Sequence, residues 1–128
     1  MVQITCAISS KLKSKYPINP RRVYLFGHSA GASFSLRMGL MESEYFAAVA
    51  IHAGALTSQD YDVIELAKRK IPISMQIGDS DQLVPLNVVR ATRDALKEAG
   101  FTVDLIEIEN HDHWYYDKAS KFNQTAWT

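Results

Sequence analysis

The sequence predicts an α/β fold, with a mostly parallel sheet of about four strands flanked by helices. Two observations support this fold class. Short apolar runs alternate with longer segments of helical character along the 128 residues, and such alternation indicates strand–helix–strand crossovers. One of these runs, Ala47–Ile51, is apolar throughout, as expected of a parallel strand that is covered on both faces.

The first element expected is an amphipathic helix over Val2–Tyr16. Its apolar residues Ile4, Ile8 and Leu12 recur every four positions, which places them on one face of a helix. Pro17 follows directly and is expected to end the helix, because proline cannot continue a helical hydrogen-bond pattern.

The next strand is predicted over Val23–Phe26, and it leads through a glycine-containing turn into a helix over Ala30–Leu40. The remaining predicted elements are the strand Ala47–Ile51, a helix over Asp60–Lys70 ended by Pro72, the strand Ile73–Ile77, a helix over Leu86–Ala99 closed by Gly100, the strand Val103–Ile108, and a last helix from about Asp117. No repeat, linker or low-complexity tract interrupts this order, so residues 1–128 are expected to form a single domain.

Composition narrows the classes of function. The hydrophobic share of 47% and the charged share of 22% are ordinary for a globular protein. Fourteen basic residues balance fourteen acidic ones, so no overall field attracts nucleic acid. No apolar run is long enough to span a bilayer. Cys6 is the single cysteine, which excludes an internal disulfide and a multi-cysteine metal site.

The pentapeptide Gly27-His28-Ser29-Ala30-Gly31 has the pattern G-x-S-x-G between a predicted strand and a predicted helix. This context is typical of a nucleophile elbow, a sharp turn that exposes a serine hydroxyl. The chain is expected to pass so closely to itself there that a side chain at Gly27 or Gly31 would clash. The N–H of Ala30 would point to the space where an oxyanion could form.

Polar residues follow three of the predicted strands at their carboxyl ends. Ser29 follows the first strand, Asp79 and Asp81 follow the third, and His111 and His113 follow the fourth. In a parallel sheet these ends meet at one edge, where α/β proteins place their sites. A hydroxyl, a carboxylate and an imidazole are therefore expected close together.

On these residues the sequence resembles the α/β-hydrolase family, in which a serine, an aspartate and a histidine follow one another in that order. The segment Gly78–Pro85 is similar to the family's G-x-x-D-x-x-V-P stretch. The segments Pro20–Gly31 and Asp112–Tyr116 are similar to the branch of polyhydroxybutyrate depolymerases, feruloyl esterases and esterase D-like proteins. The resemblance extends over nearly the whole chain, from about Tyr16 onward.

The resemblance implies a catalytic triad and no cofactor or metal. Ser29 would attack a carbonyl, His113 would take its proton and later pass it to the leaving group, and Asp81 would orient the imidazole. Two alternatives stay open. Asp79 could be the carboxylate instead of Asp81, and His111 could be the base instead of His113.

Other residues near the same edge are candidates for lining a substrate site, with packing inside the fold as the alternative. These candidates are His28, His52, His111 and Trp114. Trp114 and the following Tyr115–Tyr116 would either wall an acyl or aromatic pocket or form an aromatic corner behind the histidine. The spacing His111-x-His113 alone, without a third ligand nearby, is weak evidence for a metal site.

The resemblance also implies a partial α/β-hydrolase fold. Family members carry several strands and an H-G-G-type oxyanion motif before the elbow, whereas 26 residues precede Gly27 here and contain no such motif. The chain is therefore expected to correspond to the C-terminal part of the domain, with the earlier strands absent. Pairing with a missing N-terminal half or with another chain would complete the sheet.

The function predicted from these features is a serine hydrolase that cleaves small-molecule or polymeric carboxylic esters through an acyl-enzyme. Two alternatives are a serine peptidase of the prolyl-oligopeptidase type and an inactive hydrolase fragment.

Overall fold

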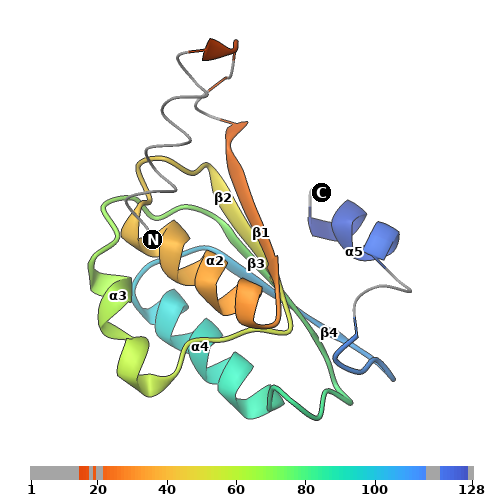
Figure 1. Cartoon of the computed structure of the whole chain (residues 1–128). Helices are drawn as coiled ribbons and strands as arrows, with labels where there is room; N and C mark the ends of the chain where they lie inside the picture. Colours follow the sequence, from red (N-terminus) through yellow and green to blue (C-terminus); the bar gives the residue numbers. More distant parts are fainter. Residues whose placement is uncertain (1–14, 18, 20–21, 115–118, 127–128) are drawn as a thin grey trace.

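The computed structural model describes residues 15–17, 19, 22–114 and 119–126, and its centre is a sheet of four parallel strands (Figure 1). The strands are β1 (Tyr24–His28), β2 (Ala48–His52), β3 (Ile73–Gly78) and β4 (Val103–Ile108). They lie side by side in chain order, and all three pairings are parallel. This arrangement confirms the predicted α/β fold class.

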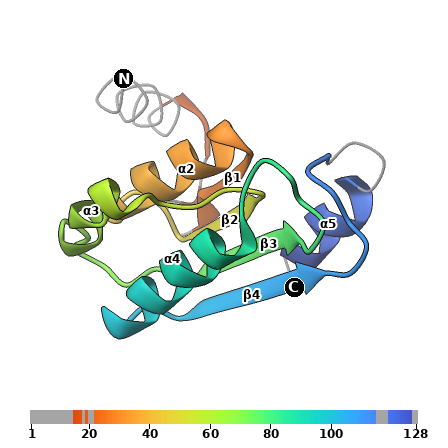
Figure 2. The ribbon, with the colours of Figure 1, turned by 90° about the horizontal axis from the view of Figure 1, so that it is seen from below.

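Helices connect the strands and cover both faces of the sheet unequally. The helical elements are α2 (Ala30–Met41), the 3₁₀ turn η2 (Ser58–Asp60), α3 (Asp62–Glu65), α4 (Leu86–Glu98) and α5 (Ala119–Ala126). Seen along the sheet, α2, α3 and α4 lie on one face and α5 lies on the other, beside β3 and β4 (Figure 2). None of the helices in the described part of the chain is long and apolar enough to cross a membrane.

The predicted helix over Asp60–Lys70 is wrong in extent. It is replaced by η2 and the single turn of α3, which ends at Glu65. The hydroxyl of Ser43 accepts hydrogen bonds from the N–H groups of Lys68 and Arg69, at 2.9 and 3.0 Å. These donors are therefore taken by a side chain from another segment, and the helix does not continue through them.

Other boundaries differ by small amounts. β1 was predicted to end at Phe26, but it continues through His28 because Gly27 and His28 pair with the end of β2. β2 likewise extends to His52. The predicted helix over Val2–Tyr16 falls almost entirely outside the described residues.

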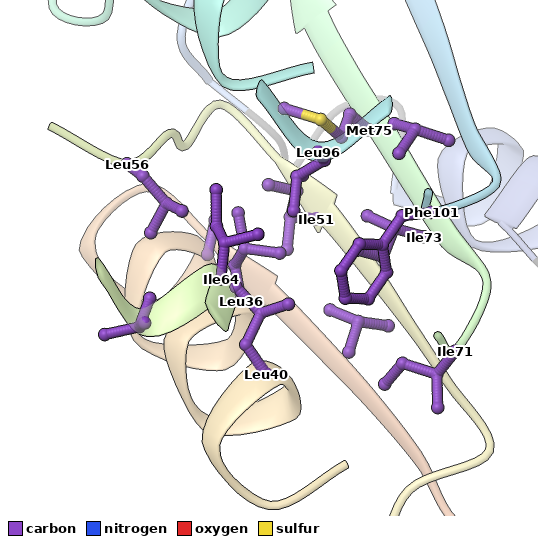
Figure 3. Packing of buried hydrophobic residues seen from close by; sticks show 14 of the residues in the cluster. Leu36, Leu40, Ile51, Leu56, Ile64, Ile71, Ile73, Met75, Leu96 and Phe101 are labelled. Atoms are coloured by element: carbon purple, nitrogen blue, oxygen red, sulfur yellow. The ribbon is translucent and has the colours of Figure 1, made fainter. Parts of the chain in front are cut away.

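The hydrophobic core lies between the sheet and the helices α2, α3 and α4. Figure 3 shows side chains from both layers packed together. From α2, Leu36 and Leu40 are four residues apart and therefore share one helix face. Ile51 of β2 and Met75 of β3 meet them from the sheet, and all four side chains are buried. This packing fixes the strands, and with them the loops that leave their carboxyl ends.

The opposite face of the sheet has a different composition at its carboxyl end. Side chains alternate between the two faces along a strand, so the residues next to Ile51 and Met75 point away from the core. These residues are His52 and Gln76, which are paired in the register, and His28 of β1 is paired with His52. A row of polar side chains thus crosses the sheet just below the loop that contains Ser29.

Candidate active site

Ser29 occupies a sharp turn between the last residue of β1 and the first residue of α2. Its backbone angles are φ 57° and ψ −121°, a conformation that residues other than glycine rarely adopt. Hydrogen bonds on both sides hold the turn. The Ser29 N–H donates to the carbonyl of His52 at 2.9 Å, and the Ser29 carbonyl accepts from the N–H of Ala32 at 3.0 Å.

The two glycines of the pentapeptide differ in their surroundings. A Cβ atom at Gly27 would lie 2.2 Å from the carbonyl oxygen of Gly31 and 2.5 Å from Oγ of Ser35. At Gly31, a Cβ atom would have no neighbour within 4 Å. The expected clash therefore exists at Gly27 only, and the prediction for Gly31 is wrong. The reason is geometric: Gly27 faces the start of α2, whereas the Cβ position of Gly31 points away from β1 into open space.

Ser29, His113 and Asp81 form a continuous hydrogen-bonded chain. Nε2 of His113 lies 2.7 Å from Oγ of Ser29, and Nδ1 of His113 lies 2.9 Å from Oδ2 of Asp81. Because the carboxylate can only accept, Nδ1 carries the proton and Nε2 of the neutral ring is the acceptor. The Ser29 hydroxyl consequently donates to His113. This is the polarity that a general base requires before it removes a proton.

Asp81 is held as a carboxylate. Its side chain is completely buried, and burial raises its pKa, but three hydrogen bonds together outweigh that effect and lower it. Oδ1 accepts from the backbone N–H groups of Leu83 and Val84, each at 2.8 Å, while Oδ2 faces His113. The carboxylate is therefore charged at neutral pH and fixed in orientation.

Asp79 has a different environment from Asp81. Its Oδ1 accepts from the backbone N–H of Asn110 at 2.8 Å and from the hydroxyl of Ser80 at 3.0 Å. Asp79 thus connects the end of β3 to the loop after β4, the loop that carries His113. The structure brings Asp81, rather than Asp79, to the imidazole.

Gly78 allows the same two segments to approach each other. A Cβ atom at this position would lie 2.0 Å from the carbonyl oxygen of His111. That carbonyl accepts a hydrogen bond from the N–H of Ser80 at 3.0 Å. The loop after β4 therefore rests directly on the end of β3, and this contact sets the position of His113.

His111 belongs to a row of three imidazoles. Nε2 of His111 lies 2.9 Å from Nε2 of His52, and Nδ1 of His52 lies 2.9 Å from Nδ1 of His28. His52 and His111 are buried, at 0% and 3% exposure. The centre of the His28 ring is 5.0 Å from that of His113, so the row ends against the imidazole that faces Ser29.

The central imidazole of this row is neutral at physiological pH. Burial, followed by the neighbouring imidazoles of His28 and His111, lowers the pKa of His52 to about 4. Burial and the adjacent His113 also lower the pKa of His28. A neutral imidazole has one donor and one acceptor, so the hydrogen bonds of the row must run in one direction, either from His28 to His111 or the reverse.

The remaining predicted residues lie around Ser29 and His113. Ala30 is the first residue of α2, and the first N–H groups of a helix have no partner within the helix. Trp114 is exposed, and its ring meets the His113 ring edge-on, at 5.8 Å and 81°. Tyr115 and Tyr116 lie outside the described residues.

Sequence reasoning missed Leu83, which lies in the loop that supplies the Asp81 carboxylate. Its side chain is 67% exposed, and it lines a pocket together with His113 and Trp114. The available signal was the return of apolar residues, at Leu83 and Val84, after four polar residues that follow a strand. Within the described ranges, no group of three or more His, Cys, Asp or Glu side chains could hold a metal ion.

Comparisons with known proteins relate this geometry to a family. The family model for phospholipases and carboxylesterases matches residues 2–122. No protein with a curated description is significantly similar to the chain.

Solved structures, a thermostable esterase among them, have the same fold. Arabidopsis thaliana SOBER1 is 25% identical, with a TM-score of 0.79 over 97% of this chain and 60% of its own length. A thermostable esterase is 26% identical, with a TM-score of 0.68, and the match covers 98% of this chain and 32% of the esterase. A PHB depolymerase complexed with an R3HB trimer is 17% identical, with a TM-score of 0.65 over 77% of this chain and 41% of its own, and this likeness concerns the fold alone.

The chain therefore spans about 60% of the length of SOBER1. The resemblance to α/β-hydrolases is confirmed by both kinds of comparison. Because the family model matches residues 2–122 of 128, the chain belongs to the phospholipase/carboxylesterase family.

Proposed function

We propose that the protein is a serine hydrolase that cleaves carboxylic esters through an acyl-enzyme, with Ser29, His113 and Asp81 as its catalytic triad. The observation that carries the proposal is the hydrogen-bonded chain from Asp81 through His113 to Ser29, with distances of 2.9 and 2.7 Å. Membership of a family of phospholipases and carboxylesterases supports an ester as the substrate.

The first half of the reaction forms the acyl-enzyme. Oγ of Ser29 attacks the ester carbonyl carbon while Nε2 of His113 removes the hydroxyl proton. The buried carboxylate of Asp81 stabilises the imidazolium that results. The carbonyl oxygen becomes an oxyanion, which the N–H of Ala30 at the start of α2 would stabilise.

Collapse of this tetrahedral intermediate completes the first half by expelling the alcohol, and the second half then hydrolyses the acyl-enzyme. Nε2 of the imidazolium gives its proton to the leaving alkoxide, and the alcohol departs. A water molecule, deprotonated by His113, then attacks the acyl-enzyme, and its collapse returns the carboxylic acid and free Ser29. Every proton transfer uses the same nitrogen, so the leaving alcohol and the water must occupy the same side of the acyl group.

The strain at Ser29 fits this role. A turn at φ 57° and ψ −121° costs stability of order 1 to 3 kcal/mol, yet it lifts the hydroxyl out of the strand toward His113. Two backbone hydrogen bonds compensate for part of that cost: the Ser29 N–H donates to the His52 carbonyl, and the Ala32 N–H donates to the Ser29 carbonyl.

The experiment that tests the proposal compares hydrolysis of a 4-nitrophenyl ester and of the 4-nitroanilide with the same acyl group. The ester should be cleaved much faster, and Ser29→Ala should lower kcat/KM by roughly 10⁴-fold or more. Ser58→Ala is the matched control, because Ser58 is an exposed serine of η2. Preferential cleavage of the anilide would indicate a peptidase, and activity that survives Ser29→Ala would overturn the proposal.

A further inference from the structure

A pocket of about 250 Å³ lies beside His113 in the described part of the chain. Its lining residues are Gln82, Leu83, Asp112, His113 and Trp114. The two apolar members are unusually exposed for their size, with 67% of Leu83 and 60% of Trp114 accessible. Exposed large apolar side chains next to a reactive group are typical of a binding surface.

The position of the pocket indicates which half of an ester, the alcohol or the acyl group, would lie in it. Under the proposed function, Nε2 of His113 gives its proton to the leaving oxygen, so that oxygen must come within hydrogen-bond distance of His113. The oxyanion forms at the other side of the Ser29 hydroxyl, near the start of α2. A pocket lined by His113 itself is therefore on the side of the leaving alcohol, and the acyl chain has to extend elsewhere.

The chemistry of the lining indicates the kind of alcohol. The ring of Trp114 is nearly perpendicular to that of His113, at 81°, and is largely exposed. Such an indole can bind a flat partner, since aromatic groups favour offset and edge-to-face contacts. Leu83 supplies an apolar wall. The carboxylate of Asp112, which accepts a hydrogen bond from the backbone N–H of Trp114 at 2.9 Å, disfavours an anionic group.

The size of the pocket is sufficient for one ring. A cavity of about 150 Å³ with apolar walls can hold benzene, and this pocket is larger. We infer that Leu83 and Trp114 form a subsite for the alcohol half of the ester, and that this subsite favours neutral aryl alcohols. The inference rests on the proposed function and names the substrate class of the same site.

The test uses two acetate esters whose alcohols have similar acidity, phenyl acetate and hexafluoroisopropyl acetate. Similar acidity makes the chemistry of bond cleavage comparable, so the ratio of their kcat/KM values reports on binding of the ring. Trp114→Ala should lower the ratio of phenyl to hexafluoroisopropyl acetate by roughly 5-fold. Leu83→Ala should lower it by roughly 3-fold, because less apolar surface is lost.

Leu66→Ala is the matched control for both variants. Leu66 is also an exposed leucine, at 55%, but it lies after α3 and does not line the pocket. Its ratio should equal that of the unaltered protein. Thermal unfolding of the three variants should coincide, because all three side chains are largely exposed.

A second readout separates the alcohol side from the acyl side. Both esters give the same acetyl-enzyme, and the alcohol has left before that intermediate is hydrolysed. Trp114→Ala should therefore leave the rate of deacylation within about 2-fold of its original value. A larger fall in deacylation, a step in which the alcohol takes no part, would mean that Trp114 contacts the acyl half, and would overturn the inference.

Failure of this inference is distinguishable from failure of the proposed function. Ester hydrolysis that requires Ser29, with an unchanged ratio in both pocket variants, would overturn the alcohol subsite alone. Absence of ester hydrolysis by the unaltered protein would overturn the proposed function and the subsite with it. A fall in the ratio at Leu83 and Trp114 but not at Leu66 would support both.

Discussion

The carboxyl edge of the sheet and the core behind it are built in opposite ways. In the core, side chains such as Leu36, Met75 and Leu96 are fully buried and apolar. At the edge, some of the buried side chains are polar, among them His52 and His111. Apolar burial stabilises the fold, whereas burial of polar groups costs free energy unless they are hydrogen-bonded.

Strained backbone positions are also found at the carboxyl edge of the sheet. Among the described residues, the non-glycine positions with positive φ are Ser29, Ala53 and Asn110. Each directly follows β1 or β2, or lies in the loop after β4. Burial of apolar side chains in the core therefore offsets the free-energy cost of the strained backbone and buried polar groups at the edge. This is the usual relation between a scaffold and its site.

The largest expected effect at this edge comes from comparing substitutions of its two carboxylates, Asp81 and Asp79. Asp81→Asn should lower kcat/KM for ester hydrolysis by roughly 10⁴-fold, because an amide cannot hold the imidazole in the tautomer that accepts the serine proton. Asp79→Asn keeps an oxygen that can accept the N–H of Asn110 and should cost less than about 10-fold. Steady-state kinetics near pH 7.5 measures both, and the reverse order would assign the carboxylate role to Asp79.

The two glycines of the pentapeptide offer a matched pair for stability. Gly27→Ala should lower the free energy of unfolding by about 3 kcal/mol, because its Cβ would meet the backbone of Gly31 and Ser35 Oγ, and tight cores do not absorb such contacts. Gly31→Ala has open space and should raise it by about 0.5 kcal/mol, since alanine favours a helix. Urea unfolding of both variants measures the difference. Equal destabilisation would contradict the one-sided clash.

The stability of the fold should depend on pH because of the buried imidazoles. The pKa of His52 is lowered from 6.5 to about 4, so the unfolded chain binds a proton that the folded protein does not as pH falls between these values. The contribution of His52 to the free energy of unfolding should be at its maximum above pH 6.5 and should fall by about 3 kcal/mol between pH 6.5 and 4. His28 shifts in the same direction.

His52→Leu should remove most of that pH-dependent fall, as urea unfolding at several pH values would show. Asp81→Asn is the control, because the pKa of Asp81 is lowered below 3.8 and its contribution is lost only as pH falls below that value. An unchanged slope in His52→Leu would mean that His52 is not the group that titrates.

The smallest effect concerns strain at the nucleophile itself. Ser29→Gly should be more stable than Ser29→Ala by about 1 kcal/mol, because glycine adopts φ 57° and ψ −121° without the cost that alanine carries. Both variants should be inactive. Thermal unfolding at one pH compares them, and equal stability would show that the turn holds no strain.

Much of the fold could be predicted from local patterns. The four apolar runs became β1 to β4 within two residues at each end, because a buried parallel strand needs apolar residues in sequence. The helix over Asp60–Lys70 was wrong because Ser43, distant in sequence, takes the N–H groups of Lys68 and Arg69. Periodicity carries no information about such a partner.

The site was predictable only where its residues follow strand ends. Chain order brought Ser29, Asp81 and His113 to one edge as candidates, and their catalytic roles stay a prediction. The hydrogen-bonded row of His28, His52 and His111 depends on strand register, which no local pattern specifies. The open space at Gly31 depends in the same way on how α2 leaves the turn.

The most direct measurement is covalent labelling of the folded protein with a fluorophosphonate, followed by mass mapping of the adduct. We expect one adduct on Ser29, no adduct in Ser29→Ala, and much slower labelling in His113→Ala, because the serine loses its general base. Labelling of Ser29→Ala at the original rate, or no labelling of a protein shown to be folded, would contradict the assignment of Ser29 as the nucleophile.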